Sequence, residues 1–195
     1  MAEGLTETAA LRREVINAPS IIPKKVKVKI RFQESRSCIR EYLEFQKKLM
    51  MACLDSGACM RTKWYEPYKC IMFRAEALVG DRMVAVGYLY LILNYTKHGL
   101  IYDLYVARAW RRKGIGSALV KAAILYGKKI NSPKIKAIVP DEETAEMMRL
   151  QGIDVNPEAC EKLLKKLGFI ERGDGVYMYY IRYKPRFLKE KRENT

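Results

Sequence analysis

The sequence predicts a single α/β domain of the α+β type, built on a central, mixed but mostly antiparallel twisted sheet that is flanked by helices. Two observations lead to this prediction. Segments with the two-residue period of strands alternate along the chain with segments whose apolar residues recur at helical spacing. Three strand-like segments also follow one another directly, and the short turns between them favour antiparallel pairing. The length of 195 residues is enough for one domain with a sizeable core.

The first half of the chain is predicted to form a strand, a helix and a meander of three strands. Apolar and basic side chains alternate over residues 26–32, as expected of a half-buried strand. Apolar residues at helical spacing then predict a helix over residues 35–54, which ends at Asp55-Ser56-Gly57. The glycine in the connection 80–82 is a hairpin signal. The strands of the meander are predicted over residues 69–79, 83–95 and 100–106.

The second half is predicted to alternate helices with shorter strands. A turn with two glycines leads into a helix over residues 115–130, and a short buried strand follows over residues 134–139. Pro157 suits the start of the last helix and Gly168 its end. Two final strands flank Gly173-Asp174-Gly175, a second hairpin signal. The remaining helices and strands are predicted over residues 141–150, 158–167, 169–171 and 176–183.

Composition divides the chain into a domain with two tails. Residues 1–23 mix small and charged side chains with prolines and predict a flexible N-terminal leader. Residues 24–184 form the predicted domain, and residues 185–195 a basic C-terminal tail. The first residues lack the apolar core of a secretory signal, and no apolar run is long enough to cross a bilayer. We therefore expect a cytoplasmic protein without membrane contact.

The cysteines favour a reduced protein without a metal. They are odd in number, scattered, and contain no CxxC pair or cluster with histidine, so no zinc site is expected. Buried free thiols are the simpler interpretation, although a Cys53–Cys59 bridge stays open. The five positions are Cys38, Cys53, Cys59, Cys70 and Cys160.

The net charge of +15 favours acidic partners, such as the phosphates of a cofactor, an anionic substrate or nucleic acid. The basic residues are spread from Lys24 to Arg192, without one compact cluster interleaved with aromatics. Nucleic-acid binding is therefore possible but not favoured. Nothing in the sequence indicates an oligomeric state.

One loop carries the strongest chemical signal. Residues 111–116, Arg-Arg-Lys-Gly-Ile-Gly, join a predicted strand to a predicted helix. The glycines allow close backbone approach, and the first amides of the helix have no intrahelical acceptor, so an anion such as a diphosphate can bind there. The loop could also be an ordinary glycine-containing turn with solvated basic side chains. It is not a Walker loop, which needs GxxxxGK[ST], or a dinucleotide loop, which needs a third glycine.

The context of this loop resembles the GNAT superfamily of acyl-CoA-dependent N-acyltransferases. The stretch 104–119, Leu-Tyr-Val-Ala-Arg-Ala-Trp-Arg-Arg-Lys-Gly-Ile-Gly-Ser-Ala-Leu, is similar to the acyl-CoA motif of that superfamily, [Q/R]xxGxG/A after a strand ending in valine. The stretch 163–169, Leu-Leu-Lys-Lys-Leu-Gly-Phe, resembles its second signature, a helix ending in Gly-Phe. Two motifs in the right order, on the right elements, are far more specific than either alone.

The resemblance implies a GNAT-like fold and an N-acetyltransferase that uses acetyl-CoA or another acyl-CoA and no metal. The acyl group would pass directly to a primary amine of a protein, peptide or small molecule. It would lie where the strands over residues 100–106 and 134–139 splay apart. Two alternatives stay open: a catalytically silent CoA-binding or regulatory module, and a basic nucleic-acid-binding protein on the same fold. The implied cofactor-binding residues are Leu104, Tyr105, Val106, Arg111, Arg112, Lys113, Gly114, Ile115, Gly116 and Ser117.

The sequence departs from the family pattern in three places. Arg108 stands where a proline is common, and residues 141–156 look like an insertion before the Gly-Phe helix. Leu164 occupies the position where many members carry a tyrosine that protonates the leaving thiolate. The general acid of the family is therefore missing from its usual place.

Several side chains are candidates for proton transfer. For the base we consider His98, Tyr102 and Asp103, with Glu142 and Glu143 further along the chain. Strand alternation predicts that His98 and Tyr102 share one face of the strand and that Asp103 lies on the other. His98 equally suits a solvated turn, Tyr102 a packed sheet residue, and Asp103 an ion pair. For the acid, the substitutes are Tyr177, Tyr179 and Cys160.

Overall fold

The computed structural model describes residues 28–56, 67–150 and 152–181 of the chain. The predicted leader, residues 1–23, and the predicted tail, residues 185–195, lie outside the described residues, as does Cys59 of the considered Cys53–Cys59 bridge. None of the helices in the described part is both long and apolar enough to cross a membrane.

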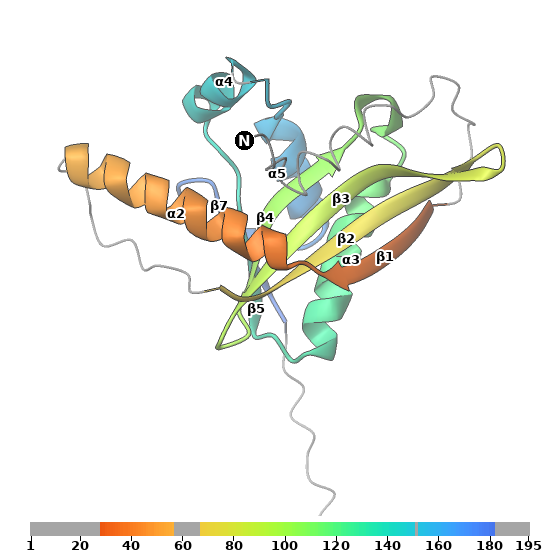
Figure 1. Ribbon diagram of the computed structural model, residues 1–195, viewed down its shortest axis with the longest axis horizontal. Helices are drawn as coiled ribbons and strands as arrows, with labels where there is room; N and C mark the ends of the chain where they lie inside the picture. Colours follow the sequence, from red (N-terminus) through yellow and green to blue (C-terminus); the bar gives the residue numbers. More distant parts are fainter. Residues whose placement is uncertain (1–27, 57–66, 151, 182–195) are drawn as a thin grey trace, which may run out of the picture.

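A seven-stranded sheet in the order β1-β2-β3-β4-β5-β7-β6 forms the centre of the fold (Figure 1). All neighbouring strands are antiparallel except β4 and β5, which are parallel. The mixed, mostly antiparallel sheet predicted from the sequence is confirmed. The strands are β1 Val28–Glu34, β2 Pro67–Val79, β3 Arg82–Asn94, β4 Gly99–Val106, β5 Lys134–Ile138, β6 Ile170–Glu171 and β7 Val176–Tyr180.

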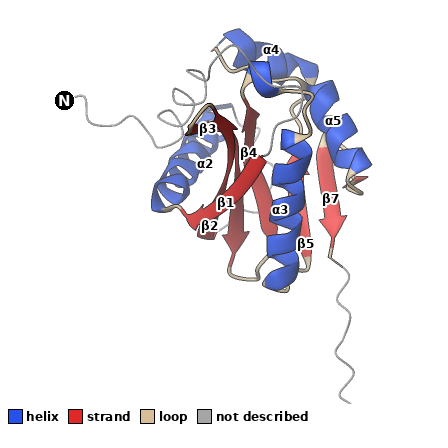
Figure 2. Cartoon of the chain, turned by 90° about the vertical axis from the view of Figure 1, so that its right-hand side faces the viewer, coloured by secondary structure: helices blue, strands red, loops and turns tan. Residues whose placement is uncertain are grey.

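Helices cover both faces of this sheet, so that its middle strands are buried on both sides. Helix α2 lies on one face, and helices α3 and α5 lie on the other (Figure 2). Strand β3 is accordingly buried along nine successive residues of its burial pattern, as expected for a strand between two layers. The helices are α2 Arg36–Ser56, α3 Ile115–Lys129, α4 Glu142–Leu150 and α5 Pro157–Lys166, and a 3₁₀ turn, η1, spans Arg108–Trp110.

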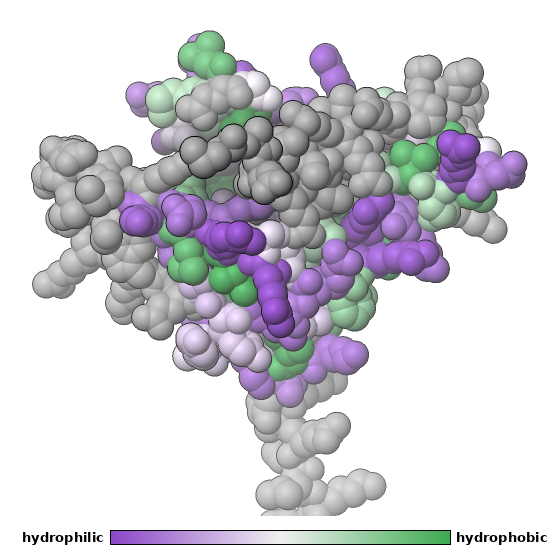
Figure 3. Space-filling view, in the orientation of Figure 1, coloured by the Kyte–Doolittle hydropathy of each residue, from purple (hydrophilic) through white to green (hydrophobic). Residues whose placement is uncertain are grey.

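Two apolar clusters fill the space between the sheet and its helices. The larger cluster lies on the face of α3 and α5 and includes Trp110, Leu119, Ile135 and Leu164. The smaller one lies under α2 and is rich in tyrosine, with Tyr42, Tyr88 and Tyr90 at its centre. The edge strand β1 is polar: Arg31 pairs with Glu76 at 2.9 Å, and Figure 3 shows hydrophilic residues where β1 faces the viewer. A charged edge of this kind discourages pairing with another chain.

A disulfide between Cys38 and Cys70 joins α2 to β2. The two Cα atoms lie 6.2 Å apart, within the range that a disulfide spans, and both side chains are fully buried. The expectation that the cysteines are free thiols is therefore wrong for this pair, because packing of α2 on the sheet brings together residues that are 32 positions apart. Among the described cysteines, Cys160 is free, as expected.

Candidate functional site

The turn between β4 and α3 presents a row of backbone amides. Arg112 and Gly114 both have a left-handed backbone, with φ values of 61° and 79°, which for Gly114 is the reason that glycine suits the position. The first hydrogen bond of α3 runs from the Ala118 amide to the Gly114 carbonyl at 2.9 Å. Within the described part of the chain, the amides of residues 115–117 donate to no backbone carbonyl. They form the positive end of a helix dipole and can bind an anion.

A cavity of about 410 Å³ opens beside these amides. Its walls are formed by the end of β4, the turn, the first residues of α3, the segment before α5 and one side of α5. Apolar side chains outnumber polar ones in this lining. Arg111, Arg112 and Ser117 bring polar groups to the turn, and Asp154, Asn156 and Lys162 bring them to the wall formed by α5 and the segment before it. Such a cavity suits a ligand with an apolar arm and an anionic group. The lining residues are Leu104, Tyr105, Val106, Trp110, Arg111, Arg112, Gly114, Ile115, Gly116, Ser117, Asp154, Val155, Asn156, Ala159, Cys160, Lys162 and Leu163.

Two details of the cavity wall fit a bound cofactor. A Cβ built on Gly116 would lie 3.4 Å from Leu163 Cδ2 and 3.9 Å from Val106 Cγ2, so a larger side chain would enter the space between α3 and α5. The indole nitrogen of Trp110 is buried and finds no acceptor among the described residues, and a buried donor without a partner is costly. A coenzyme A molecule has amide and phosphate oxygens that can accept from such groups.

Arg111 contacts both sides of the cavity wall. Its Nε donates to the Val106 carbonyl at 3.0 Å, and its Nη2 lies 2.8 Å from Asp154 Oδ2. These two contacts hold the positive charge of Arg111 across the cavity wall. One carbonyl of the β4 edge, that of Val106, is thereby already engaged.

Strands β4 and β5 separate after three paired positions, from Gly99–Ile135 to Ile101–Ala137. The chain after β5 turns toward β7 instead, where the Val139 amide donates to the Gly175 carbonyl at 2.9 Å. This approach is so close that a Cβ on Gly175 would lie 2.2 Å from the Val139 carbonyl oxygen. The predicted splay between the two strands is therefore present in the structure.

A second cavity, of about 130 Å³, lies in the opening between β4 and β5. It shares four lining residues with the first cavity, so the two are neighbours along one path. The shared residues are Leu104, Val155, Cys160 and Leu163; the others are Ile101, Tyr102, Asp103, Ala137, Ile138, Val139, Pro140 and Leu164.

Tyr102 and Asp103 both border this opening, but not in the predicted arrangement. The register of β3 and β4 shifts between Tyr90 and Leu91, whose partners are Asp103 and Ile101, so Tyr102 forms a bulge. Both side chains consequently lie on the α2 face. The ring of Tyr102 packs on that of Tyr42 at 5.2 Å between centroids, and the Tyr88 hydroxyl donates to Asp103 Oδ2 at 3.0 Å. The prediction that they occupy opposite faces is wrong, because the extra residue changes the alternation.

Tyr42 packs behind Tyr102 and does not itself line the opening. Burial, reinforced by the neighbouring Tyr102, raises the pKa of Tyr42 to about 12. The phenol is therefore neutral at physiological pH and accepts a 2.6 Å hydrogen bond from the amide of Gln46.

The structure separates His98 from the two cavities. His98 lies in the turn between β3 and β4, where its amide donates to Asn94 Oδ1 at 2.8 Å. Strand β4 starts beside it and runs toward the loop, so roughly 25 Å of extended chain separate His98 from the loop. His98 lines neither cavity. Burial, together with the charge of Lys134, lowers the pKa of His98. Glu142 and Glu143 are exposed at the start of α4, and neither lines either cavity.

Tyr177 is also away from both cavities. Its side chain is fully buried in the larger core cluster, and on the sheet it pairs with Ala137 of β5. Tyr179 packs on Phe169 at 5.3 Å between ring centroids. Tyr177 and Tyr179 of β7 thus pack in or against the core in this structure.

Cys160, the remaining candidate for the acid, and Leu164, at the family's usual acid position, both lie on α5. Leu164 is buried and lines the opening between the strands, where it offers no proton. Cys160, one helical turn earlier, lines both cavities. Burial raises the pKa of the Cys160 thiol, although Arg111 opposes this shift, so the thiol is protonated at neutral pH.

The sequence did not single out the segment before α5 as part of the site. Asp154, Val155 and Asn156 line the larger cavity, and they belong to the stretch 141–156 that was regarded only as an insertion. Asn156 also caps α5 by accepting from the Ala159 amide at 2.9 Å, and the Asn-Pro pair at the start of a helix was the available signal. In the described residues, no group of three or more His, Cys, Asp or Glu side chains is arranged to hold a metal.

Three solved structures to which the chain is similar are distant from it in sequence. The ribosomal-protein-S18-alanine N-acetyltransferase from Escherichia coli is 14% identical, with a TM-score of 0.49, over 83% of this chain and 99% of that one. PaiA N-acetyltransferase from Thermoplasma acidophilum, in complex with coenzyme A, is 14% identical, with a TM-score of 0.46, over 80% and 99%. A GNAT-family acetyltransferase from Staphylococcus aureus is 17% identical, with a TM-score of 0.46, over 79% and 100%.

No curated protein matches the chain in sequence. A family model does match: that of the acetyltransferase (GNAT) family aligns with residues 39–152. The matched segment is more than half of the chain and runs from α2 through the loop to the end of α4. The chain therefore belongs to the GNAT acetyltransferase family and is an acyltransferase that uses acyl-CoA.

Proposed function

We propose that the protein transfers an acetyl group from acetyl-CoA directly to a primary amine of a protein, peptide or small molecule. The observation that carries this proposal is the continuity of the site. Unbonded amides at the start of α3 open into a largely apolar cavity, and this cavity leads to the opening between β4 and β5. A diphosphate, an apolar arm and a small acyl group need these three environments in this order.

The chain's own residues would bind and orient the cofactor. The amides of residues 115–117 would hold the diphosphate, with Arg112 and Lys113 adding positive charge. Beyond Ile101, β4 has no pairing with β5 in the described structure, so its edge is available for strand-like hydrogen bonds to the amides of the cofactor arm. Bound acetyl-CoA would supply an activated thioester, whose carbonyl carbon is the electrophile.

Asp103 is the candidate base that the geometry supports best. An amine attacks only when it is neutral, so a proton must be removed from the ammonium form. The Asp103 carboxylate is half-buried at the opening, and the Tyr88 hydroxyl fixes one of its oxygens at 3.0 Å. A carboxylate in an aromatic wall also attracts a cationic amine, and Tyr102 beside it would contribute to that wall.

Cys160 is our candidate for the acid that Leu164 cannot supply. Its thiol is protonated because burial raises its pKa, and it borders both cavities, where a leaving thiolate would emerge. A catalytically silent CoA-binding module is the second candidate function. The one observation that favours it is Leu164, which cannot donate a proton to the leaving thiolate. A silent module would bind acetyl-CoA but would transfer no acetyl group.

Calorimetric titration with acetyl-CoA tests the cofactor assignment, and Gly116→Glu is the informative variant. We expect micromolar binding to the natural chain and a loss of at least about a hundredfold in the variant, because the carboxylate fills the site and repels the diphosphate. Lys121→Glu, an exposed change on the same helix, is the control that separates this local effect from overall charge. Equal affinity in Gly116→Glu and the natural chain would contradict the proposal.

Release of free thiol in the presence of a panel of amines and peptides then tests catalysis. Asp103→Asn should remove most of the rate, whereas His98→Gln and Tyr177→Phe should leave it within about threefold, because these side chains lie away from the opening. Cys160→Ala should lower the rate most at high pH, because few other proton donors to the leaving thiolate are available there. Binding of acetyl-CoA without any thiol release across the panel would support the silent module instead.

A further inference from the structure

The two cavities meet at a shared wall. Four side chains line both cavities: Leu104 from β4, Cys160 and Leu163 from α5, and Val155 from the segment between α4 and α5. We call these four residues the collar. Any group that moves from the larger cavity into the opening between β4 and β5 passes between them.

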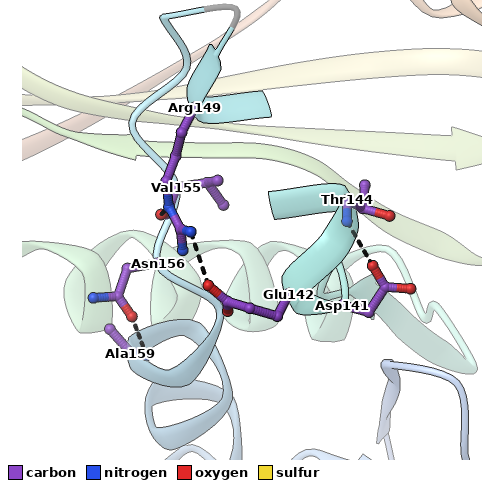
Figure 4. A network of polar contacts seen from close by, with 7 residues as sticks. All are labelled: Asp141, Glu142, Thr144, Arg149, Val155, Asn156 and Ala159. Atoms are coloured by element: carbon purple, nitrogen blue, oxygen red, sulfur yellow. Dashed lines mark hydrogen bonds and ion pairs between the residues drawn. The ribbon is translucent and has the colours of Figure 1, made fainter. Parts of the chain in front are cut away.

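Val155 is held in the collar by α4. The Val155 carbonyl accepts from Arg149 Nε at 3.2 Å, and Arg149 Nη1 lies 2.8 Å from Glu142 Oε1 at the other end of the same helix (Figure 4). Arg149 thus links the start of α4, through Glu142, to Val155 in the segment between α4 and α5. The position of Val155 depends on this helix and not only on α5.

The residues on either side of Val155 are anchored as well. Asp154 pairs with Arg111 at 2.8 Å, on the loop side of the cavity. Asn156 caps α5 through the Ala159 amide at 2.9 Å, and Asp141 caps α4 through the Thr144 amide at 2.8 Å (Figure 4). These contacts hold the backbone on both sides of Val155 and so place its side chain in the collar.

The space behind the collar is small and largely apolar. It measures about 130 Å³, and Ala137, Val139 and Leu164, all at most 4% exposed, close its inner side. One water molecule takes up about 30 Å³ of liquid, so the space holds roughly four groups of that size. An acetyl, propionyl or butyryl group fits there, and an eight-carbon chain does not.

We propose that the collar limits the acyl group to short chains, with Val155, presented by α4, as the residue that determines this selectivity. The inference rests on the proposed use of acyl-CoA at this site and adds a size limit to it. A pocket that is short by even one methylene group discriminates by about 10- to 200-fold. Removal of the Val155 side chain should therefore relax the limit without changing how the diphosphate is held.

Calorimetric binding of coenzyme A, acetyl-CoA, butyryl-CoA and octanoyl-CoA tests the proposal without an acceptor. In the natural chain we expect octanoyl-CoA to bind at least about tenfold more weakly than acetyl-CoA. Val155→Ala should reduce this ratio to about threefold or less, and free coenzyme A, measured with the same variant, corrects for any change that the substitution makes in the larger cavity. Val155→Phe should act in the opposite direction and weaken acetyl-CoA relative to coenzyme A.

Ile153→Ala is the matched control, because Ile153 lies in the same segment, is also half-buried and lines neither cavity. In this variant the ratio of the dissociation constants for octanoyl-CoA and acetyl-CoA should stay as it is in the natural chain. Equal binding of octanoyl-CoA and acetyl-CoA by the natural chain, or the same ratio in Val155→Ala, would overturn the size limit while leaving cofactor binding intact. Absence of coenzyme A binding in the natural chain would instead refute the proposed function itself.

Discussion

Replacing Asp154 by asparagine should tighten the binding of coenzyme A. Asp154 puts a carboxylate into the wall of the cavity that we assign to an anionic cofactor, and it holds Arg111 at 2.8 Å. The side chains are 51% and 32% exposed, so this ion pair itself contributes little to stability. Asparagine keeps the size of the side chain, removes the negative charge and releases Arg111 to face the ligand.

The size of the effect follows from the repulsion that is removed. At roughly 7 Å, a separation suited to a cavity of about 410 Å³, and an effective dielectric constant of about 40–80, one pair of unit charges interacts by about 0.6–1.2 kcal/mol. This energy corresponds to a gain in affinity of about three- to eightfold at low ionic strength. The gain should shrink as salt is raised toward 0.5 M, because exposed charges are then screened.

Isothermal titration with coenzyme A at two salt concentrations measures this gain. Asp81→Asn, in the turn between β2 and β3 and away from both cavities, removes the same charge and serves as the control. It should change the affinity by less than about twofold. Weaker binding in Asp154→Asn would refute the reasoning and would mean that the Arg111–Asp154 pair builds the site. An equal gain in both variants would show that only the net charge matters.

Three further predictions concern the framework of the site. The double variant Cys38→Ala/Cys70→Ala should lose about 3–4 kcal/mol of unfolding free energy, the loop-closure value for a separation of 32 residues; a loss below about 1 kcal/mol in urea denaturation would contradict this. Because burial raises the pKa of Cys160, its alkylation by iodoacetamide, followed by peptide mapping, should be slow at pH 7, accelerate only in alkaline solution, and be slowed by coenzyme A. Rapid labelling at pH 7 would show that the thiol is ionised there. Gly175→Ala should destabilise the fold by more than Gly173→Ala does, because only at position 175 would the new Cβ meet a backbone oxygen, at 2.2 Å.

The periodicity of the sequence predicts the bounds of the helices and strands to within a few residues. Each predicted strand and helix in the described part of the chain has a counterpart, such as α3 at Ile115–Lys129 for the predicted 115–130. Turn chemistry explains this success, since the hairpins at residues 80–82 and 173–175 lie where glycine permits a left-handed backbone. The family assignment also followed from the sequence, because its motifs are local.

Features of the site that depend on tertiary contacts could not be predicted. The bulge at Tyr102 adds one residue to β4 and brings Asp103 to the same face, a change that a two-residue period cannot reveal. The link between Cys38 and Cys70 requires α2 to be packed on β2. The contribution of Val155 and Asp154 depends on how α4 folds back beside α5. Local patterns identify the loop, and long-range packing decides what surrounds it.

The central claim is that the amides at the start of α3 hold a diphosphate. Amide chemical shifts of the ¹⁵N-labelled protein, followed during titration with coenzyme A, test it most directly. The account predicts that the signals of Gly114, Ile115, Gly116 and Ser117 move most, and that pantetheine, which lacks the diphosphate, leaves them nearly unchanged. Saturation with coenzyme A that leaves these four signals in place, while others move, would contradict the claim.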